Sequence, residues 1–376
     1  MINRIFPVLF CSLFLAACGG GGGGGSSDSS GDGGNNNQGG DAEEETFTQQ
    51  QNAYLPLIVG AGWEYSAEDK IIAEAYGTSG EYFALPSEFI LTLAEEGTPA
   101  EVSQILSSNP NTVGLKGFVG SDFSFDIEEG VEVTLKSLIF DEEILLLGGS
   151  VAPGSVAGEV VFDLNSKFLP IPLNNVRVDV TATPIINVSD STVSTPWGTL
   201  AAKEMDASLR VTGTYSTPFG PIPINITITE TSYFVAGIGP VSRSITYYLA
   251  DSIQLGEVSL DIAALINLPE PIVYVYDGLN LNSPENTVMR MRDPEQVDPA
   301  YTNLDPAQYS LLNEEEFNAI AWASVQESPS GTAFEVSASL SDPVPSITES
   351  AVIYVKENGS NNQVPVNVTF VNNEGL

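Results

Sequence analysis

Histidine is absent from this chain of 376 residues, and basic side chains are scarce: 12 Lys and Arg stand against 49 Asp and Glu, for a formal net charge of -37. Without a basic patch to neutralise phosphates, nucleic acid is a poor partner, and binding to anionic lipid through a basic face is disfavoured. Charged residues make up only 16% of the chain, so the acidity reflects missing Lys and Arg rather than acidic blocks. We interpret the net negative charge as a feature that keeps the protein soluble in a salty extracellular medium, rather than as a sign of a dedicated cation-binding role.

Cysteine is nearly absent as well, since the chain has only Cys11 and Cys18. No disulfide can therefore form in the rest of the chain. With no histidine either, a Ser-His-Asp triad, a Cys-His dyad and the usual zinc sites are excluded. The sequence also lacks a P-loop and a Rossmann glycine fingerprint. We therefore predict a protein that is not an enzyme and that has no cofactor and no metal site.

The first 17 residues have the organisation of a signal peptide. A short positive start, MINR, precedes the apolar run IFPVLFCSLFLAA, which at 13 residues is too short to span a bilayer as a helix. No later stretch approaches the roughly 20 apolar residues that a spanning helix needs. The run ends in LAAC, which looks like a bacterial lipobox, so we predict cleavage before Cys18 and lipidation of its thiol. Gly19 follows where an aspartate usually retains such proteins in the inner membrane, which predicts outer-membrane sorting.

Residues 18–51 then form a segment of Gly, Ser, Asn, Asp, Glu and Gln with almost no apolar content. Such a segment cannot bury enough apolar surface to offset the entropy of ordering, so we predict a disordered tether. A Gly-rich coil of this length spans about 30 Å on average.

From Tyr54 onward the chain consists of short segments in which apolar and polar residues alternate, and turn residues separate these segments. In VRVDVTATP, Val176 and Val178 alternate with Arg177 and Asp179, the period of two that marks a half-buried antiparallel strand. Helical signals are few: GTPAEVSQILSSNP (97–110) has a cap, a first-turn proline and a proline stop, and NEEEFNAIAW (313–322) is a second candidate. We predict a mainly β protein with one or two short helices.

A boundary is expected near LINLPEPIVYVYDG (265–278), where prolines separate two strand-rich blocks. We assign 52–268 to a β-rich module and 269–376 to a C-terminal domain. The length and strand pattern of the second block suit an immunoglobulin-like β-sandwich, with an Asn358-Gly359 hairpin turn.

Three pieces of the first block stand out: YLPLIVGAGWEY (54–65), STPWGTLAAKEMDASLRVTG (194–213) and SYFVAGIGPVSRS (232–244). They resemble, in the same order, motifs of a family of bacterial envelope lipoproteins related to the TapB and DUF3108-like proteins. The chain departs from the family at Ala236, where proline is common, and by about a hundred additional residues between the first two pieces. The resemblance implies a curved antiparallel sheet around a helix or groove, like the periplasmic lipoprotein carriers, and no settled enzymatic activity.

The aromatic and glycine residues of these motifs have plain physical interpretations. We expect core or sheet-face packing, rather than ligand stacking, for four side chains: Trp63, Tyr65, Tyr233 and Phe234. Gly237 and Gly239 are expected to permit positive φ or close packing at a turn.

Two groups of acidic or amide residues are the remaining candidates for chemistry. The densest acidic group contains Asp122, Asp126, Glu128 and Glu129, and a second group, Asp277 to Asn282, has oxygen ligands at alternate positions. Neither meets the spacing of an EF-hand. We favour a solvated strand face for the first and a strand-edge turn for the second, while a calcium site or a pair of glycosidase carboxylates stays open.

We therefore expect a lipid-anchored outer-membrane protein, periplasmic or surface-exposed, that serves as a non-enzymatic binding or envelope-assembly module. Its partner would be an envelope protein. The alternative is a carrier or chaperone that holds an apolar ligand in the concave sheet. A carbohydrate-active enzyme that uses two carboxylates is the third hypothesis.

Overall fold

The computed structural model describes most of the chain after residue 51. The described residues are 52–56, 58, 61–67, 70–78, 88–95, 102–108, 111–128, 131–147, 154–166, 172–217, 220–249, 253–276, 288–291, 298–338, 348–360 and 363–372. The predicted signal peptide, Cys18 and the predicted tether lie outside these residues.

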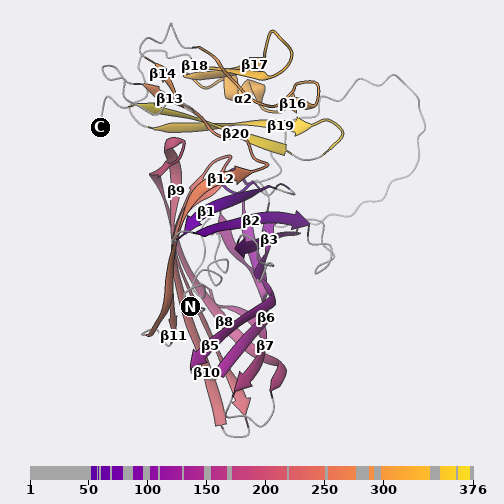
Figure 1. Cartoon of the computed structure of the whole chain (residues 1–376), viewed down its shortest axis with the longest axis vertical. Helices are drawn as coiled ribbons and strands as arrows, with labels where there is room; N and C mark the ends of the chain where they lie inside the picture. The colour runs from indigo at the N-terminus through magenta and orange to yellow at the C-terminus, as the bar shows by residue number, and fades with distance from the viewer. Residues whose placement is uncertain are drawn as a thin grey trace, which may run out of the picture.

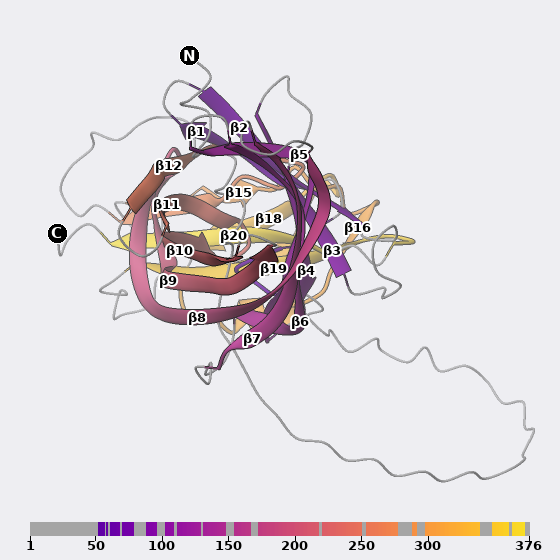
Figure 2. The same ribbon diagram turned by 90° about the horizontal axis from the view of Figure 1, so that it is seen from below.

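Twelve antiparallel strands form the first and larger part of the molecule (Figure 1). They are β1 (Gly62–Ala67), β2 (Lys70–Thr78), β3 (Glu88–Glu95), β4 (Val102–Ser108), β5 (Val113–Glu128), β6 (Val131–Leu147), β7 (Val156–Ser166), β8 (Leu173–Thr195), β9 (Gly198–Thr217), β10 (Gly220–Val235), β11 (Gly239–Leu249) and β12 (Ile253–Ile266). Each strand pairs with the next in sequence, and β12 pairs back with β1, so the ladder returns to its start. Figure 2 shows these strands surrounding a common interior. The prediction of a mainly β protein with an antiparallel sheet is confirmed.

Alternation along the strands separates this interior from solvent. In β8, Val176, Val178 and Val180 are buried, while Arg177 and Asp179 between them are exposed. The period of two in the sequence therefore has the expected cause: one face of the strand packs on the core and the other meets water.

The helix expected within residues 97–110 is wrong. Its central part forms strand β4, which pairs with β3 on one side and β5 on the other. Two ladders of backbone hydrogen bonds and the burial of Ile105 and Leu106 outweigh the local capping signal, since helix propensity is a weak prior against tertiary packing. The second candidate is confirmed: helix α2 (Glu314–Asn318) buries Phe317.

The C-terminal part consists of two sheets that enclose a separate hydrophobic core. One sheet has the order β14-β13-β20-β19-β16 and the other β15-β18-β17. Their bounds are β13 (Ile272–Tyr276), β14 (Val288–Met291), β15 (Ala300–Tyr301), β16 (Tyr309–Leu311), β17 (Ala323–Glu327), β18 (Phe334–Ala338), β19 (Glu349–Glu357) and β20 (Gln363–Asn372). Strand β13 runs parallel to both of its neighbours, so the sandwich mixes parallel and antiparallel pairing, unlike the all-antiparallel immunoglobulin pattern.

The C-terminal sheet packs against one end of the strand ring. Val273, Val275 and Val371 belong to the same hydrophobic cluster as the interior of the ring. The buried Asn367 side chain in β20 donates a hydrogen bond to the backbone carbonyl of Ala236, with a donor–acceptor distance of 2.6 Å. This end of the ring is therefore covered by the C-terminal sheet, as Figure 1 shows.

Tyr274 in β13 makes the stability of the C-terminal core depend on pH in the alkaline range. The side chain is fully buried and its hydroxyl donates to the Val336 carbonyl at 2.9 Å. Burial raises the pKa of Tyr274 from 10.0 to about 12. The folded state therefore holds the phenol proton more tightly than the unfolded state, so stability is lost as pH rises from about 10 to about 12.

We expect the free energy of unfolding to fall in this window with a slope that approaches about 1.4 kcal/mol per pH unit beyond the other titrating groups. Urea unfolding of the unchanged chain and of Tyr274→Phe at several pH values measures this difference. Tyr276→Phe, two residues along the same strand and partly exposed, is the control and should keep the full alkaline loss. Identical pH profiles for the unchanged chain and Tyr274→Phe would contradict the expectation.

Candidate functional site

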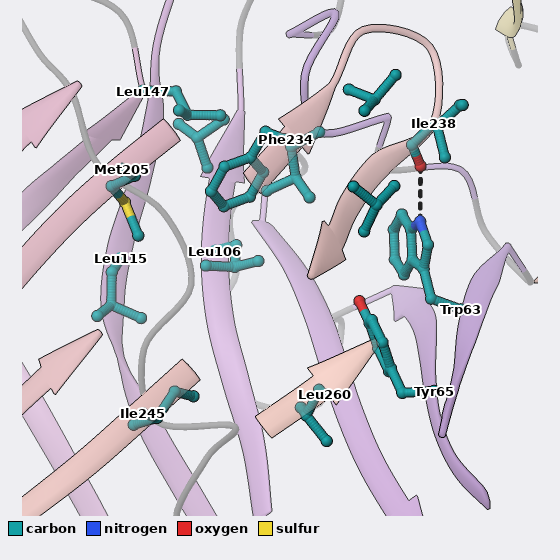
Figure 3. Packing of buried hydrophobic residues seen from close by; sticks show 14 of the residues in the cluster. Trp63, Tyr65, Leu106, Leu115, Leu147, Met205, Phe234, Ile238, Ile245 and Leu260 are labelled. Atoms are coloured by element: carbon teal, nitrogen blue, oxygen red, sulfur yellow. Dashed lines mark hydrogen bonds between the residues drawn. The ribbon is translucent and has the colours of Figure 1, made fainter. Parts of the chain in front are cut away.

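The aromatic residues singled out in the sequence lie in the core, as expected. Trp63, Tyr65 and Phe234 are fully buried in the interior of the ring (Figure 3). Tyr233, on the other face of β10, is partly buried. These side chains pack within the protein rather than line a ligand site.

The first and third motifs meet around one turn. The Trp63 indole N–H donates to the carbonyl of Ile238 at 2.6 Å (Figure 3). The Tyr65 hydroxyl donates to the carbonyl of Pro240 at 3.1 Å. Ahead of β1, the carbonyl of Ala53 accepts a hydrogen bond from the N–H of Gly237 at 2.6 Å. The N-terminal segment is therefore fixed to the β10–β11 turn, although the two lie about half the chain apart in sequence.

A buried ion pair lies in the interior of the ring and was missed by the sequence reasoning. Glu230 on β10 and Arg243 on β11 have side-chain exposures of 1% and 0%, and their atoms lie 3.2 Å apart. The Ser232 hydroxyl donates a short hydrogen bond to the same Glu230 oxygen. The available signal was the strand phase, because Glu230 occupies the buried face of β10 between Ile228 and Ser232. Because both side chains are almost fully buried within the sheet, we assign the pair a structural role.

The acidic groups proposed as alternatives cannot be placed. Strand β5 contains Asp122, Asp126 and Glu128, but their side chains lie outside the described part of the chain, as do Glu129 and residues 277–282. Among the side chains that are described, no group of three or more His, Cys, Asp or Glu residues is arranged to hold a metal ion. In the same part of the chain, no helix has the length and apolar character required to cross a membrane.

One long stretch of strand is open on one side. Strand β8 pairs with β7 only up to Ala182, which faces Val156 at the start of β7. Its pairing with β9 continues without a register shift to Thr195. Residues 183–195, which we call the β8 edge, therefore have a strand partner on the β9 side and none on the other among the described strands.

The side chains of the β8 edge are also unusually accessible. Four consecutive residues, Asn187 to Asp190, are exposed, so this stretch is uncovered on both faces rather than on alternate ones. Ile185 is 59% exposed and Val188 36%, which makes them two of the three exposed large hydrophobic residues in the described part of the chain. Pro184 lies two residues after Ala182, the last residue paired with β7, and has no N–H with which to extend that ladder.

The β8 edge is electrically neutral. Its only charged residue is Asp190, and the Lys203 ammonium of β9 forms a short ion pair with that carboxylate. The hydrogen bond to Asp190 raises the pKa of Lys203. Lys203 also lies 5.9 Å from the ring centre of Tyr54, in the N-terminal segment. The neutral edge thus lies beside the point where the preceding chain joins the folded body.

Comparisons with known proteins do not assign this chain to a family. No protein-family model matches it. The periplasmic pH-dependent serine endoprotease DegQ of Escherichia coli K12 is 31% identical over 105 residues, which are 28% of this chain and 20% of DegQ. This chain therefore spans about a fifth of the length of that relative. Because it has no histidine, it cannot form a Ser-His-Asp triad.

Two solved structures are similar over 58% of this chain. One is a candidate lipoprotein of Parabacteroides distasonis, with 10% identity, a TM-score of 0.31 and all of its own chain covered. The other is a candidate exported protein of Bacteroides fragilis with a YmcC-like fold, with 12% identity, a TM-score of 0.25 and 98% of its chain covered. These TM-scores lie below the level at which a shared fold is assigned.

The sequence itself contains a signal for the β8 edge. The apolar alternation of β8 ends after Ala182, yet residues 183–195 continue with β-branched side chains: Thr183, Ile185, Ile186, Val188, Thr192, Val193 and Thr195. A strand of this length that follows the much shorter β7 must extend beyond it. The comparison of neighbouring strand lengths therefore locates the open edge.

Proposed function

We propose that this protein is a lipid-anchored protein of the bacterial outer membrane that acts by binding an envelope protein rather than by catalysis. The observation that carries the binding role is the β8 edge, a neutral stretch of 13 residues that, among the described strands, has a partner on one side only. Exposed strand edges bind other strands through main-chain hydrogen bonds. The lipobox at Cys18 supports the anchor and the outer-membrane location. We also propose that the chain is related to the TapB and DUF3108-like lipoproteins.

The anchor is tested by metabolic labelling with a palmitate analogue. Cys18→Ser should lose the label completely and leave the membrane fraction, because the Cys18 thiol is the group to which the lipid would be attached. Cys11→Ser is the matched control, since Cys11 lies in the segment that cleavage removes, and it should label like the unchanged chain. A Cys18→Ser chain that still labels and still sediments with membranes would refute the anchor.

The absence of catalysis is tested by direct assay. Purified protein should hydrolyse neither peptides nor polysaccharides, since histidine and thiol chemistry are missing from the mature body. Hydrolysis of a polysaccharide that disappears when one carboxylate is replaced would favour the glycosidase hypothesis instead.

A carrier of an apolar ligand is the second candidate, and one observation favours it. Val160, Phe162 and Tyr215 pack against the interior cluster yet stay partly exposed, and the rings of Phe162 and Tyr215 meet edge to face at 6.3 Å. Partly exposed apolar side chains of this kind are what a hydrophobic ligand contacts. Native mass spectrometry of the purified protein separates the two candidates: a co-purifying lipid supports the carrier, while an empty protein that captures an envelope protein supports the binding module.

A further inference from the structure

We infer that the β8 edge binds a second copy of this chain, forming a symmetric dimer through antiparallel pairing of the two β8 edges. This inference rests on the proposed binding role and names the partner. It starts from the backbone: residues 183–195 keep a regular strand register with β9 and have no strand partner on their other side within the described part of the chain.

The β8 edge lacks the devices by which proteins prevent such pairing. Natural edge strands carry lysines, central prolines or bulges, or are very short. The β8 edge has 13 residues and no Lys or Arg, and its register with β9 has no shift. Its one proline, Pro184, lies at the end next to β7. Residues beyond it are rich in β-branched side chains, which favour sheets.

Charge favours this edge over other surfaces as a contact between copies. The chain carries a net charge of -37, so two copies repel each other wherever acidic surfaces meet. The β8 edge contains one acid, which is compensated by Lys203. Two copies that meet along the β8 edge therefore face little like-charge repulsion there.

The arrangement of side chains fits a two-fold axis. A symmetric antiparallel pair over the whole edge has its axis at the midpoint, Ser189, and each copy presents the same surface to the other. In this register Ile185 lies opposite Val193 of the second copy, which covers the most exposed hydrophobic side chain. Asp190 lies opposite Val188 of the second copy, so the two Asp190 carboxylates do not face each other.

The near absence of cysteine makes a clean test possible. In the full chain expressed in cells, Ser189→Cys places one thiol at the expected two-fold axis. A short bismaleimide added to the cells should then yield a covalent dimer of twice the monomer mass. Ser244→Cys is the matched control, because Ser244 is exposed on β11, which has strand partners on both sides, and it should stay monomeric.

A second substitution tests the edge itself. Ile185→Lys added to Ser189→Cys should abolish the crosslink, since a lysine at the edge disfavours strand pairing. Ser244→Lys in the same background should leave it unchanged. Ile185 is mostly exposed, so its replacement leaves the fold intact, which circular dichroism checks.

Other outcomes overturn the inference in different ways. A monomeric Ser189→Cys chain, or equal crosslinking of Ser244→Cys, refutes the dimer. A crosslink from Ser189→Cys to a different envelope protein refutes the second copy but leaves the binding role standing. The unchanged chain should give no crosslink, and a dimer formed by it would report a free thiol at Cys18 and contradict the lipid anchor instead.

Discussion

Replacing Arg243 with methionine should destabilise the protein by about 3–5 kcal/mol. The substitution removes the positive partner of Glu230 and leaves its carboxylate in an interior where both side chains are at most 1% exposed. A buried charge that loses its partner keeps the full cost of its desolvation. Urea unfolding followed by tryptophan fluorescence measures the change, because Trp63 lies in the same hydrophobic cluster as the core of the ring.

Two variants separate the ion pair from the loss of a large side chain. The double substitution Glu230→Met with Arg243→Met removes both charges and should recover most of the lost stability, since replacing both partners by apolar groups is often neutral. Arg177→Met breaks the exposed pair with Glu159 on the outer face and should cost less than about 1 kcal/mol. A double variant as unstable as Arg243→Met alone would show that packing, rather than charge, explains the effect.

Replacing Gly239 with alanine should destabilise the protein by about 3–5 kcal/mol, from two additive causes. Gly239 has a φ of 104°, which is unfavourable for any residue with a side chain. In addition, a Cβ at this position would lie 2.7 Å from the Trp63 ring, which is held by its hydrogen bond to Ile238. Because the ring is buried and fixed, it has little room to move away.

Gly220 supplies the matched control for the two causes. It has a φ of 125°, but a Cβ there would meet nothing within 4 Å. Gly220→Ala should therefore show the backbone cost alone, about 1–3 kcal/mol, and the difference between the two variants measures the contact with Trp63. If Gly239→Ala and Gly220→Ala lose equal amounts of unfolding free energy, the indole ring of Trp63 moves aside at no cost in stability.

Local pattern was sufficient to predict strand β8, the β10–β11 turn and the burial of the core aromatics. Val176 and Val178 alternate with charged residues, and Gly237 and Gly239 have φ values of 75° and 104°, as a sharp turn requires. These features depend on neighbours in sequence. The pairing of β1 with β12 depends on residues some 200 positions apart, and no local signal marks it.

Where prediction failed, long-range packing decided the structure. Residues 102–108 form a strand because β3 and β5 offer backbone partners on both sides, which the sequence of β4 alone does not reveal. Glu230 was not singled out by any motif in the sequence. Its burial follows from the phase of β10 and from Arg243, which reaches it from the neighbouring strand.

The way in which the N-terminal segment is fastened has a mechanical consequence. Tension applied through residue 52 would first load the hydrogen bond between Ala53 and Gly237, and next the indole of Trp63. It would then reach β1, which is bonded to β2 on one side and to β12 on the other. Pulling β1 out of the sheet requires that its backbone hydrogen bonds to β2 and to β12 break at the same time. The fold therefore resists force at the strand to which the preceding chain is joined.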